Sequence, residues 1–70
     1  MNEQKLIASL VHEATGLVTN MQKLDVMITN YESYNVSSTQ YDLLKRQYSV
    51  MNDYHQILDE RVHDLTESKR

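Results

Sequence analysis

The stretch from Leu43 to Val62, LLKRQYSVMNDYHQILDERV, decides the fold of this chain. It predicts a helix with two adjoining lines of mostly apolar residues, each alternating spacings of three and four. The first line comprises Leu44, Tyr48, Met51, His55, Leu58, Val62 and, just beyond the stretch, Leu65. The second line comprises Leu43, Gln47, Val50, Tyr54, Ile57 and Arg61. Because one helical partner can cover only one line, we expect this helix to have at least two neighbours.

A helix of nearly equal length is expected upstream, over about residues 3–31. Its apolar residues keep the same alternation at Ile7, Leu10, Ala14, Leu17, Met21, Leu24, Ile28 and Tyr31. The pattern stops at residues 32–37, where small polar residues gather. Ser37 followed by Gln40 has the spacing of a capping box, so the next helix should run over about 38–66. Within it, Asp42 and Arg46 are spaced for an i,i+4 ion pair.

The short link predicts an all-α fold, a long antiparallel two-helix hairpin that forms a single domain over residues 1–70. Seventy residues without cysteine bury little surface and have no disulfides to stabilise them. We therefore expect the hairpin to assemble into a homo-oligomeric helical bundle, a four-helix dimer in the simplest case.

The net charge of −3 argues against binding to a nucleic-acid polymer, because the phosphate backbone attracts basic proteins. No run of eighteen apolar residues is present to cross a membrane, and no signal segment is recognisable. We expect a soluble, cytoplasmic protein that needs neither membrane nor cofactor.

Signals for catalysis or metal binding are weak. His55, Asp59 and His63 stand at successive i,i+4 positions, where either a metal bridges them or they form a solvated row. The helix over 3–31 offers no glutamate on its apolar seam to complete a di-metal site, and no nucleophile elbow is present. We expect neither an enzyme nor a metal site. Gly16 is either a tolerated surface glycine or a point of close approach.

The most promising binding residues are Gln47, Tyr54 and Arg61, which are seven residues apart and so share one helix face. Either they form hydrogen bonds and packing contacts at a helix boundary, or the phenol ring stacks on a ligand while the guanidinium binds phosphate. Tyr48 and Lys45 are further candidates for ligand binding.

The second half of the chain resembles a family of small helical proteins of tailed bacteriophages, related to a protein of crAss-like phages. The matching residues are Leu43, Leu44, Lys45, Gln47, Met51, Tyr54, Ile57, Leu58, Glu60, Arg61 and Val62, preceded by a similar serine cap, Val36-Ser37-Ser38-Thr39-Gln40. The helix over 3–31 departs from the resemblance, with more apolar and threonine positions than family members carry there.

The resemblance implies a non-enzymatic phage accessory protein that counters host antiviral defence in the host cytoplasm, for example by sequestering a nucleotide-type immune signal within an oligomeric bundle. Two other functions remain open. One is a protein–protein inhibitor that binds a host defence protein through an exposed apolar helix face. The other is a structural or assembly component.

Overall fold

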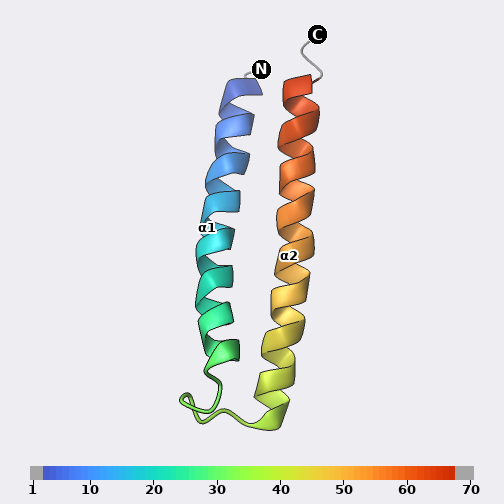
Figure 1. Cartoon of the computed structure of the whole chain (residues 1–70). Coiled ribbons are helices and arrows are strands. Elements are labelled where there is room, and N and C mark those ends of the chain that lie inside the picture. The colour runs from blue at the N-terminus through green and yellow to red at the C-terminus, as the bar shows by residue number, and fades with distance from the viewer. Residues whose placement is uncertain (1–2, 68–70) are drawn as a thin grey trace.

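A computed structural model describes residues 3–67 of the chain, and within this range all regular structure is helical. Helix α1 spans Glu3–Thr29 and helix α2 spans Ser38–Glu67. The two helices run antiparallel and side by side along their whole length (Figure 1). The molecule is a rod with extents of 51 × 16 × 15 Å. The prediction of an all-α antiparallel hairpin is confirmed; residues 1, 2 and 68–70 lie outside the described part.

The turn between the helices is tight and locally hydrogen-bonded. After α1 ends at Thr29, two residues before the predicted end, three i→i−3 backbone hydrogen bonds carry the chain round. Asn35 then adopts a left-handed φ of 51°, which asparagine tolerates better than most residues. The Ser37 hydroxyl accepts a hydrogen bond of 3.1 Å from the Gln40 backbone N–H. That contact caps α2 at the predicted place.

The core is a narrow seam between the two helices. Its most buried residues are Leu10, Leu17 and Met21 of α1 with Leu44 and Leu58 of α2. The rest of the first line is half-buried. The first line therefore faces α1, packed along a seam with heptad spacing.

The second line lies outside this seam. All six of its residues are exposed, and Val50 retains 66% of its accessible surface. A two-helix rod leaves such a line in water because α1 can cover only one side of α2.

Aromatic and basic side chains collect where the hairpin turns. The Tyr31 and Tyr41 ring centroids are 4.3 Å apart, and the Lys45 ammonium lies 4.5 Å from the Tyr41 centroid. Lys45 also approaches the Asp42 carboxylate to 4.0 Å. The predicted Asp42–Arg46 pair is thus replaced by an i,i+3 pair with Lys45, which leaves Arg46 unpaired within residues 3–67.

Candidate functional site

The exposed second line of α2 is the surface best equipped for binding. Gln47, Tyr54 and Arg61 lie on it at seven-residue intervals, separated by Val50 and Ile57. Tyr54 is 40% exposed, so part of its side chain is open to solvent. The line combines a stacking ring, an amide, a guanidinium and apolar contacts.

The first half of this line borders an open hollow of about 520 Å³. Its lining residues are Gln40, Leu43, Arg46, Gln47, Val50 and Met51. The Gln47 side-chain amide is 4.0 Å from the Met51 sulfur, which is a weak contact at most. The Gln47 amide therefore keeps most of its hydrogen-bonding capacity for a ligand or partner.

The five predicted binding residues do not form one cluster. Tyr48 packs against the core seam, where its ring contributes to the stability of the hairpin. Lys45 is directed to Tyr41 and Asp42 near the turn. Only Gln47, Tyr54 and Arg61 share the exposed second line.

Of the six residues that line this hollow, only Gln47 was among the predicted binding residues; Arg46 and Leu43 are two of the five that were not. Both carried a signal in the sequence. Leu43 belongs to the second line, and Arg46 flanks it on the side away from the first line. A search for charged residues beside an uncovered apolar line would have found Arg46.

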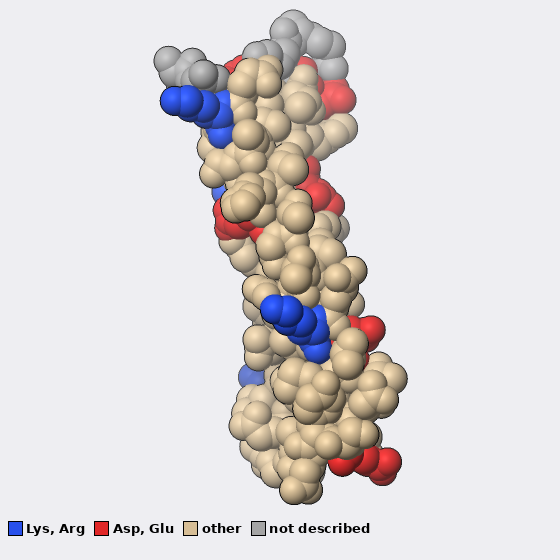
Figure 2. Space-filling view, turned by 90° about the vertical axis from the view of Figure 1, so that its left-hand side faces the viewer, with Lys and Arg blue, Asp and Glu red and all other residues tan. Residues whose placement is uncertain are grey.

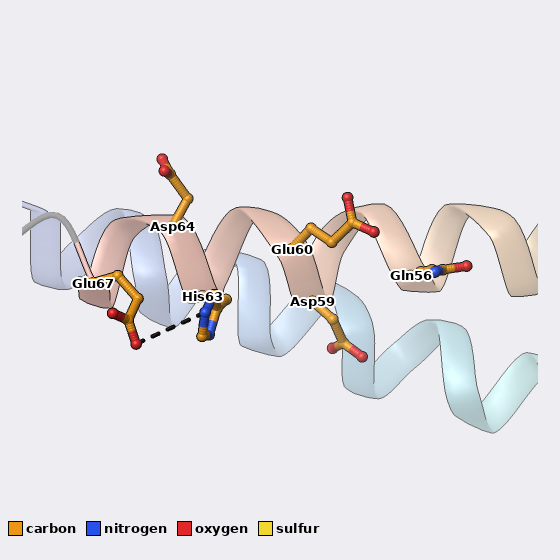
Figure 3. Close-up of a pocket in the computed structure, with 6 residues that line it drawn as sticks. All are labelled: Gln56, Asp59, Glu60, His63, Asp64 and Glu67. Atoms are coloured by element: carbon orange, nitrogen blue, oxygen red, sulfur yellow. Dashed lines mark ion pairs between the residues drawn. The ribbon is translucent and has the colours of Figure 1, made fainter.

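The far end of α2 carries an acidic surface. A second open hollow, of about 590 Å³, is lined by Gln56, Asp59, Glu60, His63, Asp64 and Glu67. The carboxylates spread around the helix instead of converging, with Asp64 and Glu60 pointing away from Asp59 (Figure 3). Such a surface repels anions.

His55, Asp59 and His63 do not act as one row, because His55 pairs with Asp59 whereas His63 pairs with Glu67. His55 Nδ1 lies 3.5 Å from an Asp59 carboxylate oxygen, whereas His63 Nε2 lies 3.7 Å from Glu67 (Figure 3). Nowhere in residues 3–67 do three or more histidine, aspartate or glutamate side chains come together so that they could hold a metal ion.

Helix α1 presents a mostly uncharged face to solvent, with charged side chains few and scattered (Figure 2). Its exposed large apolar residues are Val11 and Val26. Around Gly16, a Cβ atom would meet nothing within 4 Å, so the single chain needs no glycine there. No helix in the described residues is long and apolar enough to cross a membrane.

Fold and surface together define an all-α helical-hairpin protein with an uncovered, partly apolar face on α2. A family model matches residues 4–64, and the chain belongs to the family that this model describes, Sequestin. Its name suggests a binding, sequestering role rather than catalysis. No curated protein and no solved structure matches the chain.

Proposed function

We propose that this protein counters host antiviral defence by sequestering a nucleotide-type immune signal within a homo-oligomeric bundle, as a phage accessory protein in the host cytoplasm. The family name supports the sequestering role. The single observation that carries the ligand class is the pairing of Tyr54 with Arg61 on one exposed face.

Tyr54 and Arg61 match the two chemically distinct ends of a nucleotide. The ring of Tyr54 offers a stacking surface for a base, and the guanidinium of Arg61 can form bidentate hydrogen bonds with a phosphate. Seven residues of helix separate them by roughly 10.5 Å along the axis. The long side chains of both residues can lean along the helix and shorten the gap that a bridging ligand has to span. Gln47 lies a further two turns along and can recognise a second polar group.

An oligomer is needed because one hairpin does not enclose a ligand. The hollows along α2 are open to solvent, and pockets that hold small molecules bury most of the ligand surface. A second copy placed over the second line would close the surface and exclude water.

The test is a thermal-shift screen against cyclic dinucleotides and ADP-ribose derivatives. A ligand at a hundred times its Kd should stabilise the protein by about 2.7 kcal/mol, which raises the Tm measurably. Arg61→Ala should abolish the shift and Tyr54→Phe should retain most of it, since the ring remains. Lys23→Ala is the matched control, because it removes an exposed cation from α1 instead of α2. This variant should bind the ligand as the unmodified protein does.

If the Tm stays unchanged at saturating concentrations of these compounds, the nucleotide proposal is refuted. An increase that survives in Arg61→Ala would place the ligand elsewhere.

The apolar residues of the second line favour a second candidate, a protein–protein inhibitor. Leu43, Val50 and Ile57 repeat at seven-residue intervals and are all exposed. Such a row suits a hydrophobic groove on a host defence protein. Three results together would support this candidate over sequestration. The chain would stay monomeric, it would bind no nucleotide, and it would bind a purified defence protein in a way that Val50→Glu abolishes.

A further inference from the structure

We propose that two copies of this chain pair through the second line of α2 with their helices antiparallel, about a two-fold axis level with Asn52. This pairing rests on the proposed function for its oligomer but not for its nucleotide. It specifies which end of one copy lies beside which end of the other.

The second line is arranged symmetrically about its own centre. Nearest the axis at residue 52, the antiparallel pairing places Val50 beside the partner's Tyr54. In the next layer outward, Gln47 lies beside the partner's Ile57. Leu43 then lies beside the partner's Arg61. Each layer joins one position of the helical repeat with the complementary position of the other copy, as antiparallel coiled coils require. The axis falls at the midpoint of α2, so the pairing covers the line from end to end.

The flanking charges fit this register. Arg46, Asp53 and Glu60 lie one position before Gln47, Tyr54 and Arg61, along the edge of the line that faces away from α1. Antiparallel pairing brings Arg46 beside the partner's Glu60, and the symmetry repeats the contact. Neither residue has an ion-pair partner within residues 3–67.

The charge of the whole helix also favours antiparallel pairing over parallel pairing. Residues 38–52 carry Lys45 and Arg46 against Asp42, a net charge of +1. Residues 53–67 carry a single cation, Arg61, against Asp53, Asp59, Glu60, Asp64 and Glu67, a net charge of −4. A parallel dimer would place the two acidic halves side by side. Antiparallel pairing places each acidic half beside a weakly basic one, which reduces the repulsion.

Surface area and shape agree with a second copy as the occupant. The chain exposes 5356 Å², whereas a compact monomer of 8.3 kDa exposes about 4,600 Å². The elongated rod therefore leaves more surface open than a compact chain of its mass, and a standard interface would need roughly 800 Å² of it on each partner. The hollow beside Leu43, Gln47 and Val50 lies on one half of the line, where the partner's Tyr54 and Ile57 would pack.

Spin labelling tests the orientation directly, because the chain has no cysteine and a single one can be introduced. Thr39→Cys and Asn52→Cys place labels at exposed positions near one end and at the middle of α2. Antiparallel pairing predicts Thr39 labels separated by about 39 Å along the axis. It predicts Asn52 labels at one level on the outer faces of the pair, separated by roughly 20 to 30 Å, about the width of the two helices. A short Thr39 distance, or no dipolar coupling at either site, would overturn the pairing.

A charge exchange tests the register. Arg46→Glu should weaken dimer association by about ten-fold at low salt, since two attractive contacts become repulsive. The double variant Arg46→Glu with Glu60→Arg should restore it, because the pair is re-formed with reversed signs. Lys45→Glu is the matched control, with the same charge change directed at Asp42 and Tyr41 of its own helix, and it should weaken association less. A double variant no tighter than Arg46→Glu alone would overturn the register.

These measurements use the chain without nucleotide, so the two proposals can fail separately. An antiparallel dimer that binds no nucleotide leaves the pairing intact and removes the nucleotide function. A monomer that still shows a nucleotide thermal shift dependent on Arg61 overturns the pairing and the oligomeric bundle, and leaves the nucleotide as the ligand.

Discussion

Leu58 keeps 1% of its accessible surface, whereas Ile57, its neighbour in the chain, keeps 54%. One step along a helix turns a side chain by about 100°, which here separates the seam with α1 from the exposed second line. The two residues have almost the same size and hydrophobicity, so their environments alone decide their roles. Leu58 holds the hairpin together, and Ile57 is available to a partner.

The first prediction compares these neighbours. Leu58→Ala should lower the free energy of unfolding by about 3 kcal/mol, a large share of the stability of so small a domain. Ile57→Ala should act chiefly on association, lowering the Tm less as the protein is diluted. Thermal denaturation monitored by circular dichroism over a concentration series would check both, and equal losses from the two variants at every concentration would contradict the assignment.

The second prediction concerns the start of α2. Ser37→Ala removes the hydroxyl that accepts the Gln40 N–H and should cost about 1 kcal/mol. Ser38→Ala is the control, because this serine is the first residue of α2 and does not cap it. Chemical denaturation gives both values, and a larger loss for Ser38→Ala would show that the helix is capped differently.

The third prediction concerns the left-handed residue of the turn. Asn35→Ala should destabilise the hairpin by about 1 kcal/mol, since a Cβ without a local polar group fits φ of 51° poorly. Asn35→Gly should be tolerated much better because glycine adopts this φ without strain. If Asn35→Gly were the more damaging substitution, the side-chain amide and not the backbone angle would be what the turn requires.

The fourth prediction concerns Gly16, which lies inside α1 with open space around it. Gly16→Ala should stabilise the protein by about 1 kcal/mol, because alanine is the better helix former and its methyl meets no neighbour. A fall in the Tm would instead show that another backbone packs against this position in the assembled protein.

The fifth prediction follows from the proposed axis, which brings Asp53 near the partner's Asp53. Asp53→Asn should tighten dimer association by about two- to three-fold at low salt, because it removes a like-charge contact. The gain should disappear as salt is raised, since surface charges are then screened. Analytical ultracentrifugation at two ionic strengths would measure it; weaker association of Asp53→Asn would contradict the axis.

The sequence alone determined the hairpin. Two unbroken patterns of threes and fours, with a serine cap between them and no proline, leave the chain few alternatives to two long helices. The pattern also separated the core residues Leu44 and Leu58 from the second line. Local rules suffice here because helix periodicity and capping act over a few residues.

Only the tertiary structure decided how the candidate binding residues are distributed. In the sequence Tyr48 and Tyr54 belong to two adjoining lines with the same spacing. The position of α1 is what packs Tyr48 against the core and leaves Tyr54 exposed. Likewise, Asp42 could form an ion pair with Lys45 or with Arg46. It pairs with Lys45, whose ammonium group also lies over the Tyr41 ring. Such outcomes depend on which surfaces the fold covers, and no pattern within one helix states which of its faces a neighbour will occupy.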